Sequence, residues 1–318
     1  KKLSGMFAFA IWDSSNKELF LARDHIGIKP LYYFWDGKRF IFSSEIKAIL
    51  EHNISRVLDQ EAFNYYLRAL YVPEPLTMFS GIKKLPPATC GILKSGDFKI
   101  KKYWEVKTGN YVPSSRKEIA NIVREKISNS VKSQLVSGKP IGVYLSGGID
   151  SSIVLHSVSL LRSSIDTFSV GFELDDKEQR EKFNADFNLA RRTACHYGTN
   201  HHEILLNTQD VVNNFEKAVW NMDEPISNPT ALAMHKLALF AKQNADVVLG
   251  GDGGDELFGG YDRYRLSLAV SYWQKLPEAV RNIASLFSSQ LSKLNTSAGI
   301  DRFAMFMFQK DDVLNMVI

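Results

Sequence analysis

Short apolar runs alternate with polar turns in the opening third of the chain. Four of these runs are rich in aromatic and branched residues and are bounded by Ser-Asn, Gly and Asp-Gly turn signals. They are MFAFAIWD, KELFLARD, PLYYFW and RFIFSS, at residues 6–13, 17–24, 30–35 and 39–44. The pattern predicts a mostly antiparallel sheet. Two helical stretches, at residues 44–52 and 59–70, and a turn-rich passage over residues 71–106 are expected to follow.

A different pattern begins near Ser115. The preceding segment KTGNYVPSS, residues 107–115, is the expected linker. Ser115 and Glu118 have the spacing of a capping box and open a predicted helix. One face of this helix carries apolar residues at helical spacing: Ile119, Ile122, Val123, Ile127, Val131 and Leu135.

From Pro140 onward, apolar strands alternate with helical stretches. The expected strands are IGVYL, TFSVGF and ADVVLGG, and the expected helices include SSIVLHSVSLL and FNLARRTACHYG. This alternation is typical of a parallel sheet with crossover helices, in which ligands bind beyond the carboxyl ends of the strands. We therefore predict an α/β protein with two domains. An antiparallel, β-rich domain spans residues 1–110, and a parallel-sheet domain spans residues 111–318.

Composition narrows the class of function. The chain has 318 residues, 45% hydrophobic and 23% charged, which is typical of a globular protein of about two domains. Its formal charge of +4 is mild and dispersed, so nucleic-acid binding gains no support. The longest apolar runs fall well short of the roughly 20 residues that a membrane span needs. Cys90 and Cys195 are too few for a disulfide framework or a thiolate metal site, so a cytoplasmic setting is expected.

Two glycine-rich loops follow predicted strands. In SGGIDSS, residues 146–152, the paired glycines let backbone N–H groups approach a ligand and the serines can donate hydrogen bonds. The loop lacks the lysine of the G-x-x-x-x-G-K-[ST] phosphate loop. Its Asp150 would repel phosphate unless Mg²⁺ lay between them, which suits a magnesium nucleotide.

The second loop, GGDGGDELFGGY at residues 250–261, adds three acids, Asp252, Asp255 and Glu256. Either loop alone is equally compatible with an ordinary flexible turn. Two such loops at the strand ends of one α/β domain favour a shared nucleotide and metal site.

Five motifs together resemble the asparagine synthetase family: LSGGIDSS, TFSVGF, HYGTNHHE, MDEPISNPT and GGDGGDELFGGY. Upstream, GMFAFAIWD, LARDHIGIKPLYY and SSEIKAIL are similar to the later part of that family's glutaminase domain. The resemblance covers nearly the whole chain. It implies an antiparallel class II glutaminase domain of the Ntn type, followed by an adenine nucleotide α-hydrolase-like ATP pyrophosphatase domain.

The resemblance also implies site residues. Those expected to bind ATP or pyrophosphate are Leu145, Ser146, Gly147, Gly148, Asp150, Ser151, Val170, Gly250 and Gly251. Leu145 and Val170 would border the adenine. Asp150 and Asp255 would hold Mg²⁺ and contribute to catalysis. Asp252 falls where some members carry a glutamate proposed as the base for ammonia, and it is the third expected catalytic residue.

The implied reaction is ATP-dependent synthesis of asparagine from aspartate. It would proceed through an aspartyl-adenylate, with glutamine or ammonia as nitrogen donor and with release of AMP and pyrophosphate. ATP and Mg²⁺ are the implied cofactors. Only small-molecule partners are expected, without nucleic acid or membrane, and a homodimer is among the open oligomeric states. Two alternatives stay open: an amidotransferase or cyclase that activates another carboxylate, and an inactive nucleotide-binding scaffold.

The chain departs from the family pattern at both ends. The family's glutaminase nucleophile is an amino-terminal cysteine, whereas this sequence begins KKLSGM, and Cys90 is expected to be a buried structural thiol. We therefore expect a piece truncated at both ends that does not hydrolyse glutamine. His201 and His202 are expected to be structural. Asp223 and Glu224 are expected to end a helix, and the resemblance places them near the substrate pocket.

Overall fold

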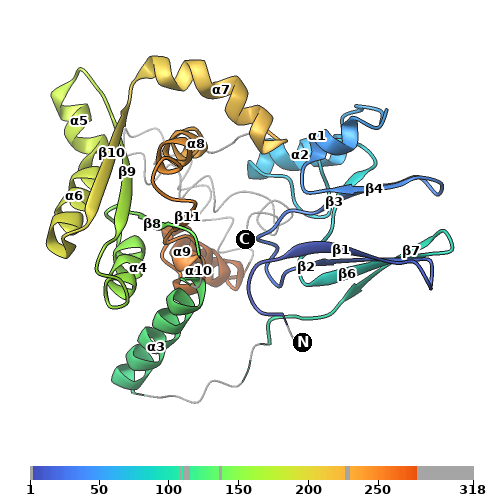
Figure 1. Ribbon diagram of the computed structural model, residues 1–318, viewed down its shortest axis with the longest axis horizontal. Coiled ribbons are helices and arrows are strands. Elements are labelled where there is room, and N and C mark those ends of the chain that lie inside the picture. Colours follow the sequence, from blue (N-terminus) through green and yellow to red (C-terminus); the bar gives the residue numbers. More distant parts are fainter. Residues whose placement is uncertain (1–2, 108, 110–114, 136–137, 226–229, 278–318) are drawn as a thin grey trace. The chain divides into compact units, whose positions relative to one another are not determined.

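The computed structural model describes residues 3–107, 109, 115–135, 138–225 and 230–277 (Figure 1). The chain divides into two compact units. One comprises Lys1–Asn121 with Asn207–Lys236, and the other comprises Ile122–Leu206 with Leu237–Ile318. Within the described ranges, every helix is too short or too polar to cross a membrane.

The first unit contains two antiparallel sheets. One has the order β1-β2-β6-β7, formed by Ala8–Asp13, Glu18–Arg23, Thr89–Lys94 and Asp97–Lys102. The other has the order β4-β3-β5, formed by Phe40–Ser43, Tyr32–Trp35 and Ile82–Lys84. The first four strands in chain order confirm the expected antiparallel pairing of the apolar runs, but they divide between two sheets, β1 with β2 and β3 with β4, where the sequence predicted one.

Strands β5, β6 and β7 correct the prediction of a merely turn-rich passage over residues 71–106. The passage contains many Pro and Gly residues, which hide the short alternating runs between them. β6 pairs with β2 far back in the sequence, and β6 and β7 form a hairpin whose turn residues Ser95 and Gly96 have φ of 51° and 80°. Non-local pairing and this tight turn therefore produce strands where local propensity alone predicts a loop.

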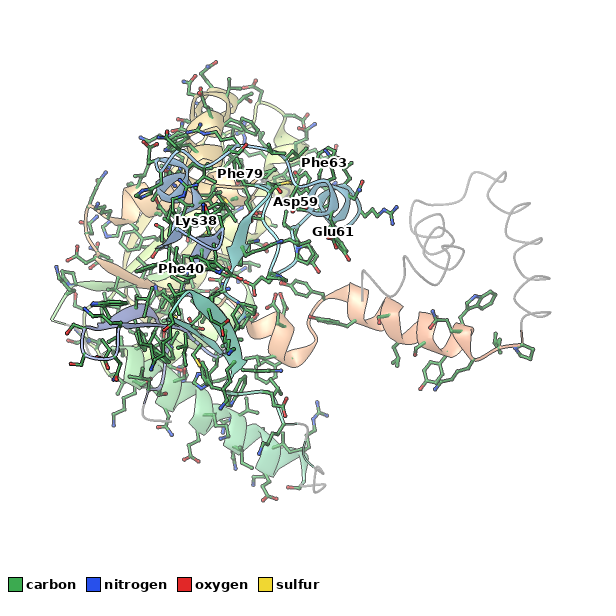
Figure 2. All side chains as sticks on the ribbon, turned by 90° about the vertical axis from the view of Figure 1, so that its right-hand side faces the viewer. Lys38, Phe40, Asp59, Glu61, Phe63 and Phe79 are labelled. Carbon is green, nitrogen blue, oxygen red and sulfur yellow. The ribbon has the colours of Figure 1, made fainter. Side chains whose placement is uncertain are left out.

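Helices α1 (Ile46–Leu50) and α2 (Gln60–Ala69) form where the sequence predicts them. The Asp59 side chain caps α2 by accepting the Ala62 N–H at 3.0 Å, and Figure 2 shows Asp59 and Phe63 at this helix. Between the sheets, the rings of Phe40 and Phe98 pack with centroids 4.7 Å apart. α7 (Thr208–Met222) also belongs to this unit.

The second unit is built on a parallel sheet with the order β10-β9-β8-β11 (Figure 1). Its strands are β8 (Ile141–Tyr144), β9 (Asp166–Phe172), β10 (Asn200–Leu206) and β11 (Val247–Leu249). Its helices are α4 (Ile149–Ser159), α5 (Lys177–Phe183), α6 (Ala185–Tyr197), α9 (Gly254–Phe258) and α10 (Asp262–Gln274). α3 (Arg116–Gln134) and α8 (Thr230–Ala241) cross the boundary between the units along the chain. The fold class predicted from the sequence is confirmed.

One hydrophobic core joins the parallel sheet to its helices. Val143 and Leu249 of the sheet pack with Leu155 of α4, Ala190 of α6 and Val131 of α3. In α3 only the later part of the predicted apolar face is buried, because Ile119 is 37% exposed and Val131 is 5% exposed. Ser115 accepts the Glu118 N–H at 3.2 Å, as expected for the first half of a capping box. Most of the expected linker, residues 107–115, lies outside the described residues.

The order of the strands fixes where a ligand would bind. The chain proceeds from β8 to β9 to β10 on one side, whereas β11 pairs with the other side of β8. The sheet therefore has its topological switch point between β8 and β11, the place where open parallel sheets bind ligands. Leu249 pairs with Val143, so the loops that follow these two strands start side by side.

Candidate active site

The first glycine loop joins β8 to α4 and is packed tightly against α6. Gly147 has φ of +83°, a conformation that residues with a Cβ rarely adopt. A Cβ added there would lie 2.9 Å from Leu189 Cβ and 3.0 Å from the Ala190 nitrogen, and closer still to the Asp186 carbonyl oxygen. Both backbone conformation and space therefore require glycine at residue 147.

The serines of this loop have different surroundings. Ser151 is 3% exposed, and its hydroxyl lies 3.0 Å from the Ser146 hydroxyl and accepts the Ser146 N–H at 3.2 Å. It also donates to the Gly148 carbonyl at 3.2 Å. Ser146 is exposed. Ser151 thus holds the shape of the loop, whereas the Ser146 hydroxyl can reach a ligand.

The start of α4 is suited to an anion. Gly148 is the N-cap residue, and no side chain caps the helix there. The first N–H groups of an α-helix have no partner within the helix and carry the positive end of its dipole. An anion such as pyrophosphate can accept hydrogen bonds from these groups.

Glycines of the second loop let it lie against Asp150. A Cβ at Gly251 would lie 2.6 Å from the Ser151 nitrogen, and a Cβ at Gly254 would lie 2.5 Å from Asp150 Cγ. Neither distance is tolerable for a real side chain. The structure thereby brings together the two loops that the sequence singles out, at the switch point of the sheet.

Negative charge gathers around Asp150. Burial is the largest cause that raises the pKa of Asp150 above its ordinary value, and the nearby Asp255 and Glu256 carboxylates raise it further. A cation would relieve this repulsion. Within the described part of the chain, no group of three or more His, Cys, Asp or Glu side chains could hold a metal ion. A site with only the two carboxylates of Asp150 and Asp255 still fits Mg²⁺, because this ion usually takes one or two carboxylates from the protein and completes its shell with phosphate and water.

Asp252 lies in the loop that follows β11, the strand paired with β8. It is exposed, and a Cβ at Gly250 would lie 2.5 Å from its Oδ2. Burial, followed by the charge of Asp252, raises the pKa of Tyr144, the last residue of β8. Asp252 therefore stands beside the junction of the two strands, where its carboxylate is open to solvent.

The two residues expected to border the adenine differ in their surroundings. Leu145 is 2% exposed and its side chain belongs to the hydrophobic core. Its N–H donates to the Phe168 carbonyl at 2.9 Å, and the Ser169 hydroxyl donates to its carbonyl. Val170 is half-buried on β9. Only the backbone of Leu145 could therefore border a ligand.

The sequence motifs alone do not indicate a structural role for Ser169 or Gly254, or the effect of Glu256 on Asp150. Ser169 is a buried polar residue within an apolar strand, which is a usable sequence signal. The close contact of Gly254 with Asp150 is a tertiary feature, and a glycine-rich loop gives no indication of which glycine makes it.

The histidine pair lies at the start of β10, away from the carboxyl ends of the strands. His201 Nδ1 lies 2.8 Å from the Thr167 hydroxyl, and His202 Nε2 lies 2.9 Å from Asp166. These contacts agree with the structural roles expected for both. Cys90 departs from expectation because it is half-buried on β6, with its sulfur 3.5 Å from the Lys101 carbonyl oxygen, and not fully buried.

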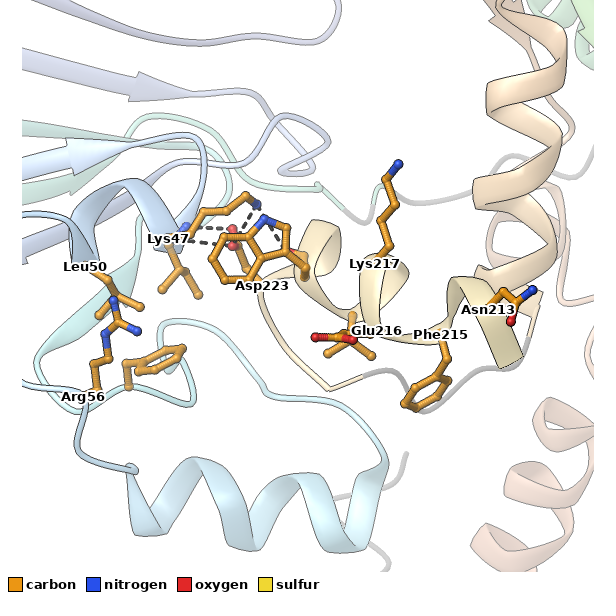
Figure 3. A pocket seen from close by; sticks show the side chains of 12 residues that line it. Lys47, Leu50, Arg56, Asn213, Phe215, Glu216, Lys217 and Asp223 are labelled. Carbon is orange, nitrogen blue, oxygen red and sulfur yellow. Dashed lines mark hydrogen bonds and ion pairs between the residues drawn. The ribbon is translucent and has the colours of Figure 1, made fainter. Parts of the chain in front are cut away.

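A pocket of about 700 Å³ lies in the first unit, between α1 and α7 (Figure 3). Its lining includes Leu50, Phe79 and Trp220, and Figure 3 shows Lys47 and Asp223 joined at its edge. The pocket lacks the glycine loops and the grouped carboxylates that suit phosphate chemistry. The candidate active site is therefore the loop pair of the second unit.

Comparison with known proteins gives two family matches. The model described as "Asparagine synthase" matches residues 122–311, and the one described as "Glutamine amidotransferase domain" matches residues 1–104. The chain is 34% identical over 285 residues to asparagine synthetase (glutamine-hydrolyzing) 1 of Bacillus subtilis (strain 168), covering 89% of this chain and 44% of that protein. It is 32% identical over 303 residues to asparagine synthetase (glutamine-hydrolyzing) 3 of the same organism, covering 92% and 49%. The chain thus spans about half the length of these curated relatives.

Among solved structures, the NH3-dependent NAD synthetase from Campylobacter jejuni subsp. jejuni NCTC 11168 in complex with the nitrate ion is similar to 61% of this chain and 96% of its own chain. The sequence identity is 15% and the TM-score is 0.32. These values are too low to assign a fold, which rests here on the strand order.

Proposed function

The chain belongs to the asparagine synthase family, and we propose that the protein containing it uses ATP to make asparagine from aspartate, with glutamine or ammonia as nitrogen donor. The observation that carries this proposal is the pair of glycine loops that meet at the switch point of the parallel sheet. The proposed domains are residues 1–110 and 111–318. A cytoplasmic location and exclusively small-molecule partners stay predictions.

In the first step, the side-chain carboxylate of the substrate aspartate attacks the α-phosphorus of ATP. A carboxylate oxygen bonds to this phosphorus, and the bond from phosphorus to the bridging oxygen of pyrophosphate breaks. The products are an aspartyl-adenylate and pyrophosphate. The exposed Ser146 hydroxyl and the N–H groups at the start of α4 are proposed to bind the leaving pyrophosphate. They offer positive dipoles where negative charge develops, which is how the loop can work without a lysine.

Gly147, Gly148 and Ser151 are proposed to shape this pyrophosphate loop. Gly250 and Gly251 are proposed to let the nucleotide approach the end of β11, and Leu145 and Val170 to border its adenine. Asp150 and Asp255 are proposed to hold Mg²⁺, which when bound would neutralise negative charge on the phosphates.

In the second step, ammonia attacks the acyl carbon of the adenylate. A C–N bond forms, the C–O bond to AMP breaks, and the attacking nitrogen loses a proton. Asp252 is proposed to accept this proton, because its carboxylate is exposed beside the strand junction. That aspartate is the substrate is also proposed, because this identification rests on the names of the relatives alone.

The test is pyrophosphate release by the complete protein, measured with MgATP, a panel of carboxylates, and ammonium or glutamine. Release that requires aspartate, and that Asp150→Asn reduces at least about a hundredfold, would support the proposal. Release with a different carboxylate would instead identify an amidotransferase or cyclase with another substrate. A folded protein that releases no pyrophosphate with any carboxylate would favour the scaffold alternative.

A further inference from the structure

Helix α7 lies within the asparagine synthase match along the sequence, but it packs with the region that matches the glutamine amidotransferase domain. Residues 208–222 lie within the asparagine synthase match, residues 122–311. The compact unit that contains them, however, consists otherwise of Lys1–Asn121, which holds the whole glutamine amidotransferase match. The chain enters this segment directly from Leu206 of β10 and leaves it at Leu237. The segment therefore joins the two matched regions.

Asp223, at the end of α7, caps helix α1. The N-cap residue of α1, Glu45, makes no side-chain capping hydrogen bond. Instead, the Asp223 carboxylate accepts the N–H of Ile46 at 2.7 Å and the N–H of Lys47 at 3.3 Å. It also pairs with Lys47 Nζ at 3.0 Å, and its side chain is only 7% exposed (Figure 3). A cap that a helix normally takes from its own sequence thus comes from 177 residues away.

Glu224 makes a second attachment one residue later. Its carboxylate accepts the Met78 N–H at 3.2 Å and pairs with Lys84 Nζ at 2.7 Å. The Glu224 and Lys84 side chains are both largely buried. Burial is the largest cause that raises the pKa of Tyr32, on β3, to about 12, and the charges of Glu224 and Asp223 raise it further.

The backbone at Asp223 supports a specific role. Its φ of 62° is left-handed, a conformation in which Asn, Asp and Gly are the usual residues. At this turn, two consecutive carboxylates contact the amidotransferase-matched region, at Ile46 and Met78. Both side chains are largely buried and paired with groups of the first unit, so they form a specific junction and differ in this from a solvated acidic helix end. None of these contacts involves the glycine loops, so they give no support to the expected place near the substrate pocket.

We propose that Asp223 and Glu224 are positioning residues that hold α7 on the amidotransferase-matched region, and that this junction is required for glutamine-derived nitrogen to reach the synthesis site. The proposal rests on the proposed function. Ammonia released from glutamine is lost to bulk water unless the donor and acceptor regions stay joined. Ammonium supplied in the medium does not depend on that junction.

The test uses the complete protein and the variant Asp223→Asn. Asparagine retains the shape of the side chain and tolerates the left-handed backbone, but it removes the charge that pairs with Lys47. Pyrophosphate release with aspartate is measured with saturating ammonium and, separately, with glutamine. Glutamate release is measured alongside. We expect ammonium-dependent release to stay within about twofold and glutamine-dependent release to fall roughly tenfold, with more glutamate formed per pyrophosphate.

Two further variants make the result specific. Glu224→Gln loses the ion pair with Lys84, while its amide oxygen can still accept the Met78 N–H. This variant is used for the same measurement if Asp223→Asn does not fold. Glu216→Gln removes the same charge from an exposed position on the same helix and should leave both rates unchanged.

An equal loss with both nitrogen sources would assign the junction a merely structural role and overturn the inference, as would no loss with either. If the unaltered protein releases no pyrophosphate with aspartate and ammonium, the proposed function itself fails and the inference fails with it. The ammonium reaction of the unaltered protein therefore separates the two failures.

Discussion

The carboxylate of Asp150 lies so close to Gly254 that a Cβ at residue 254 would stand 2.5 Å from Asp150 Cγ. These residues come from different loops, one after β8 and one after β11. Their contact joins the two loops into one candidate site. The geometry of the site therefore depends on residue 254, which has no reactive side chain.

Gly254→Ala should impair the site more than the fold. The added methyl group must push the second loop or Asp150 aside, at a cost of about 1–3 kcal/mol in the free energy of unfolding. A displacement near 1 Å would reduce pyrophosphate release by roughly a hundredfold. Gly138→Ala is the control, because nothing lies within 4 Å of its Cβ position. Equal activity of the two variants would show that the contact is unimportant.

Gly147→Ala should destabilise the protein through two separable effects. The left-handed backbone costs a residue with a Cβ about 1–2 kcal/mol, and contact with α6 adds about 1–3 kcal/mol. Gly96→Ala isolates the first effect, because Gly96 has φ of +80° with nothing within 4 Å. Urea denaturation should therefore show a larger loss for Gly147→Ala than for Gly96→Ala. A loss of the same size in both would argue against tight packing of the loop on α6.

Asp24→Asn should weaken the first unit. Asp24 is 1% exposed and its carboxylate accepts N–H groups from Phe7, Ile28 and Lys29 at 3.2, 3.0 and 2.9 Å. Asparagine keeps one accepting oxygen, but its amide nitrogen cannot accept, so either the Ile28 N–H on Oδ1 or the Phe7 and Lys29 N–H groups on Oδ2 lose their acceptor. The expected loss in the free energy of unfolding is about 2 kcal/mol. Asp13→Asn, at an exposed turn, should cost less and serves as the control.

The pH dependence of Asp24 follows from competing causes. Burial, the largest single cause, would raise its pKa, but the backbone hydrogen bonds together lower it below the ordinary 3.8. A carboxyl group with a lowered pKa stabilises the folded state above the unfolded pKa and loses this contribution as the pH falls. Asp24→Asn should therefore flatten the decline in stability below about pH 4. An unchanged decline would contradict this assignment.

His201 should make the second unit less stable in mild acid. Burial is the largest cause that lowers its pKa below 6.5; Glu203 raises it, while Arg191 and His202 lower it. The unfolded chain therefore binds the proton more readily than the folded one. Stability contributed by neutral His201 is present above about pH 6.5 and declines as the pH falls below that value. Denaturant titrations at pH 7.5 and 5.5 test this.

The matched variants are His201→Asn and His196→Gln, the second at an exposed position. The first should reduce the difference in unfolding free energy between the two pH values, and the second should leave it unchanged. The opposite pattern would mean that another group governs the acid response.

Much of the fold could be predicted from the sequence, and so could the place where the two glycine loops meet. Apolar strands that alternate with helices specify the parallel sheet, and the glycine loops after β8 and β11 indicate its ligand edge. Strands β5 to β7 could not be predicted, since Pro and Gly mask their alternation and their partners lie far away in sequence.

Within the site, residue type revealed the candidates but not their surroundings. SGGIDSS does not indicate that Ser151 is buried while Ser146 is exposed, because that difference depends on how the loop folds back on α4. The capping of α1 by Asp223 likewise depends on a contact between residues 177 positions apart. Such tertiary contacts have no local pattern.

In the proposed reaction, an aspartate carboxylate attacks the α-phosphorus of ATP at the paired glycine loops. The most direct test gives the complete protein aspartate labelled with ¹⁸O in its side-chain carboxyl group, with MgATP and ammonium. Attack by that carboxylate leaves one labelled oxygen on the phosphate of AMP when the adenylate is cleaved. We expect labelled AMP in amounts equal to the asparagine formed. Unlabelled AMP, or ADP as the nucleotide product, would contradict it.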